Sequence, residues 1–306
     1  MQLIVPFAGV LSEAGRHAAQ TLSLPRLEQL LARSHAGAAL GTDEHSLSTP
    51  HELAIAHALG WPLDDGRLPF AALAAAHDGV SVGTRAVGQL TPVHLHVGTD
   101  QVTLTDPAAL ALDAADARAL FDALQPLFGD AGFVLRWGDV QRWYVEHPSL
   151  DGLATASLDR VIGRNVDPWL PDARAGRAWQ RLASEAQMLL HAHALNARRE
   201  AAGLAAINSL WLSGCGVLES APVPAPRIDE RLRAPALNED WAAWAEAWHA
   251  LDAGPLAALL DAGDDATLTL AGERHALTLA CTGGSVWHQL RTWWRRPAAY
   301  QVLAGL

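Results

Sequence analysis

The stretch that decides the fold covers residues 193–216 and reads HALNARREAAGLAAINSLWLSGCG. It follows residues 172–193, the most clearly amphipathic segment of the chain, whose helical spacing of apolar residues predicts a helix. The apolar run at 207–212 predicts a buried strand, and Gly214-Cys215-Gly216 predicts a sharp turn out of it. A long helix that leads into a buried strand is typical of α/β proteins.

Helical and strand-like patterns alternate irregularly along the rest of the chain. Residues 3–5 predict a buried first strand, and residues 93–104 predict a hairpin around a turn at 98–100. We therefore expect an α/β protein with a mostly parallel sheet and a smaller α+β portion. The expected division is an α/β body from residues 1–80 and 150–220, a hairpin-rich portion at 81–149, and a tryptophan-rich region of helix and hairpin at 221–306 that packs on the body.

The composition argues against several classes of function. The formal net charge is -11 and the one tight basic cluster is Arg291, Arg295 and Arg296, so nucleic acid is not an expected partner. The chain contains no lysine, which rules out Schiff-base and phosphate-loop lysines. The two cysteines, Cys215 and Cys281, make no disulfide framework and fit a reducing compartment. Without a leader-like N-terminus or a long apolar run, the sequence predicts a cytoplasmic protein with no membrane partner.

Three adjoining segments resemble a known family. Residues 193–199 resemble its segment His-Pro-Val-Asn-x-x-Arg, residues 203–208 resemble Gly-Leu-Pro-Pro-Ala-Asn, and residues 209–216 resemble a strand ending in Trp-Gly-x-Gly, with Ser213 in place of the tryptophan. The same order occurs in the archaeal-type, cofactor-independent phosphoglycerate mutases of the alkaline phosphatase superfamily. Weaker similarity at 24–30 and 66–73 extends the resemblance, with gaps, over about residues 1–216. The resemblance implies a sheet body of alkaline-phosphatase-like type. In overall likeness the chain also resembles bacterial regulatory proteins of the RpfE type.

The residues that carry the family's chemistry are not matched. Its first strand is followed by a metal-binding Asp-Gly, whereas this chain has Pro6-Phe7-Ala8-Gly9 and no carboxylate before Glu13. Its nucleophile is a serine followed by aspartate, and the nearest candidate here, Ser48, has no adjacent aspartate. Its later Asp-x-x-x-His ligands have no counterpart after Gly216. A phosphoryl-transferring serine depends on such metals for activation and for charge stabilisation.

We therefore expect a degenerate phosphoglycerate-mutase-like protein that binds or regulates and does not catalyse. The expected ligand is a small phosphorylated or carboxylate anion, or a protein partner, and no cofactor is favoured. One alternative is a phosphoglycerate mutase or related metal-dependent phosphatase with Ser48 as the nucleophile. The other is a protein-interaction module that uses the tryptophan-rich C-terminal region. Trp241, Trp244 and Trp248 recur there at the spacing of a core-facing helix, whereas Trp287, Trp293 and Trp294 fit either a partner surface or a packed terminal helix.

The expected ligand site lies beside residues 193–216. Asn196 and Arg199 are three positions apart and would share one helix face, and arginine binds carboxylate or phosphate bidentately. Gly214 and Gly216 would offer backbone N–H groups to an anion at the end of a strand. Salt bridges for the arginines and capping for the asparagines are the structural alternatives. The full expected set is His193, Asn196, Arg199, Asn208, Gly214, Gly216 and Arg164.

Two histidines have the spacing of metal ligands. His94 and His96 flank Leu95 on an expected strand, so both would lie on one face, where His191 and His193 could complete a metal site. The alternative is a pair of solvent-facing histidines. The acidic, histidine-rich residues 43–52 similarly fit a metal site or a solvated helix start, and we favour the helix start. A divalent metal is thus a weak expectation.

Overall fold

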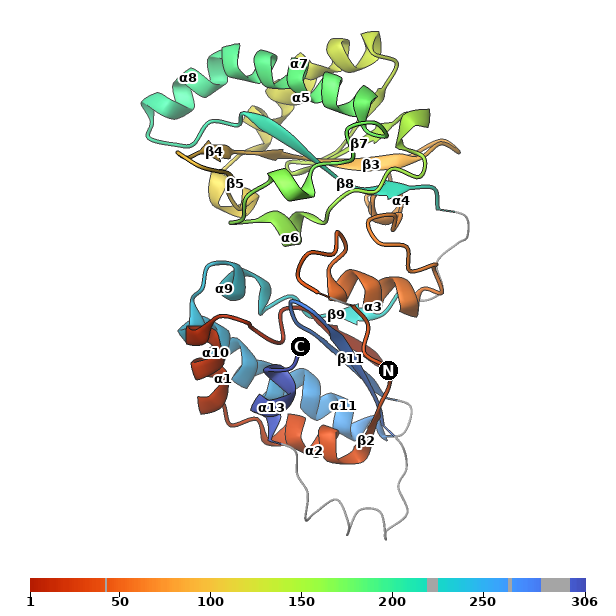
Figure 1. Cartoon of the computed structure of the whole chain (residues 1–306), viewed down its shortest axis with the longest axis vertical. Coiled ribbons are helices and arrows are strands. Elements are labelled where there is room, and N and C mark those ends of the chain that lie inside the picture. Colours follow the sequence, from red (N-terminus) through yellow and green to blue (C-terminus); the bar gives the residue numbers. More distant parts are fainter. Residues whose placement is uncertain (42, 219–224, 264–265, 282–297) are drawn as a thin grey trace. The chain divides into compact units, whose positions relative to one another are not determined.

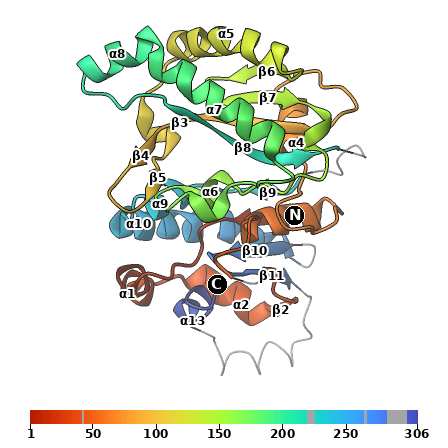
Figure 2. The same cartoon turned by 45° about the horizontal axis from the view of Figure 1, so that its top comes forward.

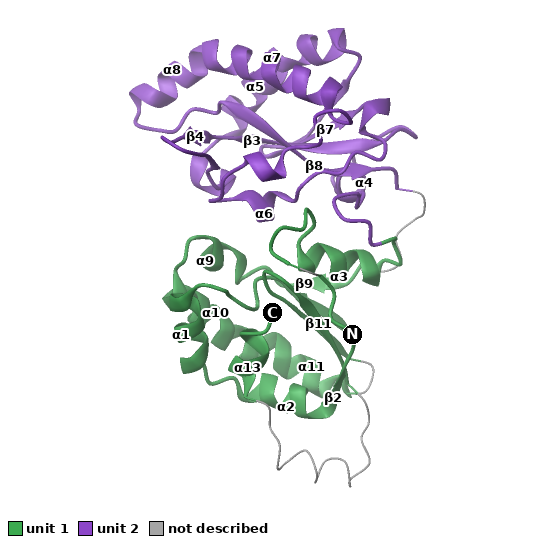
Figure 3. Ribbon diagram, in the orientation of Figure 1, with its two compact units in different colours: residues 1–62, 222–306 green, residues 63–221 purple. Residues whose placement is uncertain are grey.

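The computed structural model describes residues 1–41, 43–218, 225–263, 266–281 and 298–306 (Figures 1 and 2). The chain forms two compact units (Figure 3): unit 1 from residues 1–62 and 222–306, and unit 2 from residues 63–221. This division differs from the expected one. Residues 150–220 join residues 81–149 because the strand at 209–216 pairs with the strand at 87–93, and the C-terminal region shares a sheet with residues 2–5.

Unit 1 is built on a mixed five-stranded sheet. Its strand order is β2 (Ser34–Ala36), β11 (Ala276–Cys281), β10 (Thr267–Ala271), β1 (Gln2–Val5) and β9 (Arg227–Ile228). β1 is parallel to both of its neighbours, whereas β11 is antiparallel to β10 and to β2. The continuous apolar run Leu3-Ile4-Val5 is fully buried, as expected of a central parallel strand. The predicted α/β class is confirmed, and among the strands that the structure describes the parallel pairs are β1 with β10 and β1 with β9.

Helices cover both faces of this sheet. Leu3 and Val5 face a cluster that includes Trp244 and Trp248, so the prediction that the tryptophan stripe belongs to the core is confirmed. Ile4 points the other way, where α3 packs against β1 and β10. The helices are α1 (Glu13–Thr21), α2 (Pro25–Arg33), α3 (Pro50–Ala58), α9 (Arg233–Leu237), α10 (Trp241–Leu251), the π-helical turn η4 (Asp252–Leu256), α11 (Ala257–Asp261) and α13 (Ala299–Leu303). Trp287, Trp293 and Trp294, with the neighbouring arginine cluster, lie outside the described residues.

A distant carboxylate caps α2. Its N-cap residue, Leu24, has no side chain that can accept a hydrogen bond. The buried Asp252 accepts instead, from the backbone N–H groups of Arg26 and Leu27 at 3.1 and 2.8 Å. These N–H groups have no partner inside the helix, and a negative charge there interacts favourably with the helix dipole. The contact ties α2 to the turn that follows α10.

Unit 2 is built on an antiparallel four-stranded sheet, in the order β6 (Val134–Asp139), β7 (Arg142–Glu146), β3 (Val87–Val93) and β8 (Ser209–Gly216). A separate hairpin pairs β4 (Leu95–Val97) with β5 (Val102–Leu104), where the sequence predicted one. The helical elements are α4 (Phe70–His77), η1 (Pro107–Leu110), α5 (Ala114–Asp130), η2 (Pro148–Leu150), α6 (Leu158–Val161), η3 (Asp167–Trp169), α7 (Arg177–Ala192) and α8 (Ala194–Ala201).

Two cores lie on opposite faces of that sheet. Alternation along β7 sends Trp143 and Val145 to the larger core, under α5 and α7, and sends Tyr144 to a smaller one with the alanines of α4. Figure 1 shows α5 and α7 above the sheet and α4 below it. Asp78, just after α4, accepts hydrogen bonds from Arg142 and Tyr144, and the Arg142 guanidinium holds the pKa of that carboxyl below its ordinary value. Within the described residues, no helix is long and apolar enough to cross a membrane.

Candidate functional site

The end of β1 is where the family resemblance places a metal ligand. Phe7 lies there with a positive φ of 55°, a conformation that is uncommon for a bulky residue. Its carbonyl oxygen accepts a hydrogen bond from the Trp244 indole at 3.0 Å, and its ring lies 5.5 Å from the His51 ring. Ala8 is fully buried, and a side chain at Gly9 would collide with the backbone of Leu303 in α13. The loop is therefore packed against its own unit by apolar contacts.

These residues do not fit a metal ion. Phe7 and Ala8 have no donor side chain, and the Phe7 carbonyl is already engaged by Trp244. Ser48, the candidate nucleophile, is 2% exposed in the loop before α3. Its neighbour Thr49 caps that helix, and Glu52 completes a capping box. No group of three His, Cys, Asp or Glu side chains suited to a metal occurs in the part of the chain that the structure describes.

Asn196 lies in unit 2 and serves the backbone. Its amide nitrogen donates to the carbonyl oxygens of Leu190 and Ile207, both at 2.8 Å, and its amide oxygen accepts from the Ile207 N–H at 2.8 Å. The side chain is 3% exposed. It fixes the start of α8 to the chain that enters β8. A ligand that reached Asn196 would first have to break these bonds.

Arg199, Asn208 and His193 are engaged in the same way. The Arg199 guanidinium is buried and donates to the carbonyl oxygens of Ala205, at 2.9 Å, and Leu110. Asn208 exchanges two hydrogen bonds with the backbone of Leu95, at 2.8 and 2.9 Å. His193 caps α8 by accepting from the Leu195 N–H at 3.2 Å. Four of the expected ligand residues thus lie around α8 and the segment between α8 and β8, and their polar atoms bind backbone groups of these segments and of β4.

The two glycines allow close packing against α4. β8 runs through to Gly216, so the expected turn at 214–216 is part of the strand. A Cβ on Gly214 would lie 2.9 Å from the backbone nitrogen of Ala71, and one on Gly216 would lie 3.0 Å from Pro69. Cys215, between them, is buried, and burial raises the pKa of its thiol to about 12. That thiol is therefore not a nucleophile near neutral pH.

The remaining expected residues lie on the surface of unit 2 or only partly under it. Arg164 is half-buried in the loop after α6. The Nδ1–H of His94 donates to the Ala206 carbonyl oxygen at 2.8 Å, which makes Nδ1 the protonated nitrogen. The His94 and His96 rings lie 6.4 Å apart, and His96 is exposed. The sequence placed both histidines on one strand, whereas His94 lies between β3 and β4 and His96 belongs to β4.

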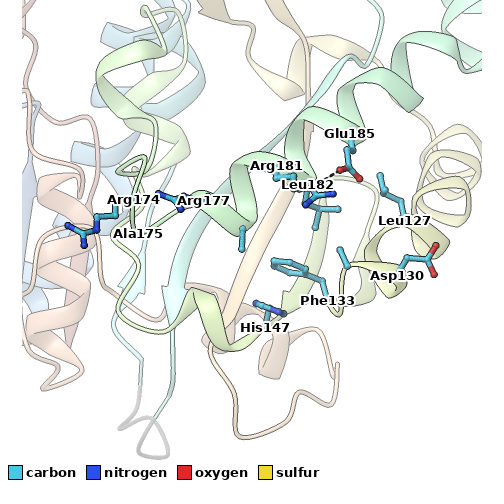
Figure 4. A pocket seen from close by; sticks show the side chains of 12 residues that line it. Leu127, Asp130, Phe133, His147, Arg174, Ala175, Arg177, Arg181, Leu182 and Glu185 are labelled. Carbon is cyan, nitrogen blue, oxygen red and sulfur yellow. Dashed lines mark hydrogen bonds and ion pairs between the residues drawn. The ribbon is translucent and has the colours of Figure 1, made fainter.

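A cavity that the sequence did not predict lies between α5, the start of β6 and the start of α7 (Figure 4). Its volume is about 800 Å³. In the view of Figure 4, Arg174 and Arg177 lie at one end, Asp130 lies at the other, and Phe133 and His147 lie between them. The lining residues are Leu127, Asp130, Ala131, Phe133, His147, Arg174, Ala175, Arg177, Ala178, Arg181, Leu182 and Glu185.

The positive charge in this cavity is unevenly distributed. Arg181 pairs with Glu185 at 3.1 Å, so its charge is locally matched. Arg174 and Arg177 have no ion-pair partner among the described residues, and both are exposed. α7 also begins without a side-chain cap and without an acidic residue in its first turn. The free positive charge therefore gathers at the N-terminal end of α7.

His147 forms part of the cavity floor. Its ring stacks on Phe133 with centroids 3.9 Å apart and an angle of 16° between the planes. Nδ1 accepts the Ser149 backbone N–H at 3.1 Å, so a neutral ring carries its proton on Nε2. Burial lowers the pKa of His147, and the charge of Arg85 lowers it further. His147 is thus neutral at pH 7 and can donate one hydrogen bond from Nε2.

Replacing Arg85 with glutamine is expected to raise the pKa of His147. The change removes the nearby positive charge that disfavours the protonated ring, while the burial remains, so the pKa should stay below its ordinary value of 6.5. An NMR titration of the His147 ring measures it. Arg16→Gln, an exposed change on α1 in unit 1, is the matched control and should leave the titration unchanged. A fall in the His147 pKa on Arg85→Gln would contradict the charge assignment.

Sequence reasoning missed this cavity for a physical reason. Arg177 and Arg181 are four positions apart, which puts them on one side of the start of α7, and Arg174 lies in the turn just before that helix. Phe133 and His147 come from the start of β6 and the end of β7. Their meeting depends on the β6–β7 pairing, which places Val134 opposite Glu146.

Comparisons with known proteins give similarities of structure only. No family model matches the chain, and no curated protein matches it significantly. Among solved structures, the chain is similar to the cofactor-independent phosphoglycerate mutase from Thermoplasma acidophilum DSM 1728, with a TM-score of 0.37 and 16% identity over 94% of this chain and 91% of that one. It is also similar to the PH0037 protein from Pyrococcus horikoshii, with a TM-score of 0.49 and 13% identity over 93% of this chain and 88% of that one.

Proposed function

We propose that the protein is a phosphoglycerate-mutase-like protein that works by binding a small anion and not by metal-dependent phosphoryl transfer. One observation carries the proposal. Where the resembling family has a metal-binding aspartate, this chain has Phe7 and Ala8, and the loop is closed by contacts to Trp244, His51 and α13. A missing ligand could be replaced by a neighbouring carboxylate, but a packed apolar loop leaves no place for the ion.

The surroundings of Ser48 support the same reading. Phosphoryl transfer needs an activated nucleophile and fixed positive charge on the phosphoryl oxygens. Ser48 is almost completely buried, and the first turn of α3 beside it is organised by the capping pair Thr49 and Glu52. Glu52 is committed to the Thr49 backbone N–H at 2.9 Å. The residues around Ser48 thus secure a helix start.

The ligand class is proposed from the arginines. With no lysine in the chain, an anion has to be held by arginine, backbone N–H groups or histidine. Two exposed arginines, Arg174 and Arg177, for which the described residues show no ion-pair partner, lie at one cavity of unit 2. A regulatory role of the RpfE type is compatible with such binding, and binding of the ligand would then be the signal that changes the activity of the regulator.

Phosphoglycerate mutase activity is expected to be absent or marginal. The measurement is a coupled assay of purified protein with 3-phosphoglycerate and added manganese or zinc, with a known cofactor-independent mutase as the positive control. A turnover above ~1 per second, within the ordinary enzyme range, would contradict the proposal. Ser48→Ala separates genuine activity from contamination, because activity carried by this chain through Ser48 would disappear in that variant.

A further inference from the structure

The cavity at the start of α7 has the composition of a site for an amphipathic organic anion. One end is cationic, through Arg174 and Arg177, and the middle is apolar, through Leu127, Phe133 and Leu182. Its volume of about 800 Å³ is within the range of small-molecule sites. Phosphate and carboxylate groups are the usual partners of arginine forks. An apolar wall favours a ligand with a carbon body over a bare inorganic ion.

We propose that this cavity binds a small organic phosphate or carboxylate, with the charged group at Arg174 and Arg177 and an apolar, preferably aromatic, body over the His147 ring and Leu127. The inference deepens the proposed function by naming the site and the ligand class. It rests on one part of the proposed function, namely that the protein acts by binding an anion. The site does not include Ser48 or residues 193–216.

The turn before α7 is built to present Arg174. Asp172 accepts hydrogen bonds from the backbone N–H groups of Arg174 and Ala175 at 3.0 and 2.9 Å, and its carbonyl oxygen accepts from Gly176 at 2.7 Å. These bonds fix the backbone from which the exposed Arg174 side chain extends. Arg177 follows in the first turn of a helix of 16 residues. The helix dipole adds to the same positive end.

The apolar part of the floor is equally fixed. Phe133 is 4% exposed and is covered by the stacked His147 ring. The two bonds from Ser149, at 3.1 Å from its backbone nitrogen and 2.7 Å from its hydroxyl, hold the His147 ring in that orientation. Nε2 then remains for a ligand acceptor. A flat ligand ring can stack on an imidazole held in this way.

Glu185 and Asp130 set the polarity of the site. Glu185 is engaged by Arg181, and Asp130 lies at the end of the cavity away from Arg174. An anionic group is therefore attracted to one end and repelled from the other. A ligand with a single negative group has one favoured orientation, whereas a ligand with negative groups at both ends fits poorly because one of them would lie beside Asp130.

The test is calorimetric titration of the whole chain, in a buffer containing EDTA, with phenyl phosphate, benzoate and inorganic phosphate as probes. Phenyl phosphate or benzoate should bind with saturation, and inorganic phosphate should bind at least ~10-fold more weakly because it lacks the apolar body. Tighter binding of phenyl phosphate than of benzoate would identify a phosphate site, and the reverse order would identify a carboxylate site. Ring NMR signals of His147 should shift as the organic probe is added.

The double variant Arg174→Gln/Arg177→Gln should weaken the better organic probe by ~10-fold or more, since each arginine contributes a charge-assisted hydrogen bond. Both side chains are exposed, so the variant should fold normally. Arg16→Gln/Arg227→Gln, which removes the same charge from exposed positions of unit 1, should leave binding unchanged. Equal weakening in both double variants, no saturable binding of either organic probe, or unshifted His147 signals would overturn the proposal. Because EDTA is present and turnover is not measured, mutase activity would contradict the proposed function without affecting this result.

Discussion

Asn196→Ala is expected to lower the free energy of unfolding of unit 2 by about 2–5 kcal/mol, because each of the two buried backbone groups it leaves without a partner costs about 1–3 kcal/mol. Those groups are the carbonyl oxygen and the N–H of Ile207, whereas the Leu190 carbonyl loses one donor and keeps the His193 N–H at 3.1 Å. Two compact units can unfold separately, so the global denaturation curve is not sufficient. Native-state hydrogen exchange, read from peptides within residues 63–221, measures the loss.

Asn165→Ala is the matched control for this change. Asn165 also lies in unit 2, but its side chain accepts one exposed hydrogen bond, from the Asp167 N–H at 3.3 Å. Its loss should cost less than about 1 kcal/mol. If Asn196→Ala were no more costly than Asn165→Ala, the hydrogen bonds of Asn196 would not hold the end of α7 to β8. The residue would then be free for the ligand role that its sequence motif implies.

Trp244→Ala is expected to lower the free energy of unfolding of unit 1 by about 3–5 kcal/mol, the usual cost of truncating a buried tryptophan. Trp244 is fully buried and makes edge contacts with Trp241 and Trp248, with ring centroids 6.2 and 6.0 Å apart. Its indole also holds the Phe7 carbonyl at the end of β1. Hydrogen exchange in peptides of unit 1 measures the effect.

Trp244→Phe separates the packing of Trp244 from its hydrogen bond. The phenylalanine keeps most of the apolar volume and removes the donor to Phe7. Trp244→Phe should therefore lower the free energy of unfolding by about 1–2 kcal/mol less than Trp244→Ala does. Exchange at residues 6–9 should still rise in both variants, because each frees the Phe7 carbonyl. Protection that is unchanged at residues 6–9 would show that Trp244 does not fix the loop after β1.

The local pattern of the sequence predicted single helices and strands better than it predicted which strands pair with each other. The alternation at 93–104 gave the β4–β5 hairpin, and the apolar run 3–5 gave the central strand β1. The strand β7 was missed, although Trp143 and Val145 alternate with Tyr144 as a two-faced strand requires. The pairing of β8 with β3 could not be read locally, because strands distant in the sequence pair by burying a shared core. That pairing decides which residues belong to unit 2.

The residues that the sequence predicted to bind a ligand, at 193–216, make hydrogen bonds to the backbone in the structure, which the sequence motif could not show. A buried asparagine and arginine look the same in a motif whether they bind a ligand or backbone carbonyls. In this chain Asn196 and Arg199 donate hydrogen bonds to backbone carbonyl groups at a helix end and in a loop. A buried carbonyl group without a hydrogen-bond partner costs free energy. Gly214 and Gly216 were expected to expose N–H groups, and instead they let α4 approach β8. The arginine spacing of α7 was visible, but its cavity needed the tertiary structure.

The central claim is that the end of β1 no longer holds a metal ion. It is tested most directly by elemental analysis of the purified protein after incubation with excess manganese and zinc and removal of the free ions. We expect less than ~0.1 equivalent of either metal, because Phe7 and Ala8 supply no ligand and the loop between β1 and α1 is packed. Two equivalents of metal that remain bound, and that are lost on Ser48→Ala, would contradict the claim.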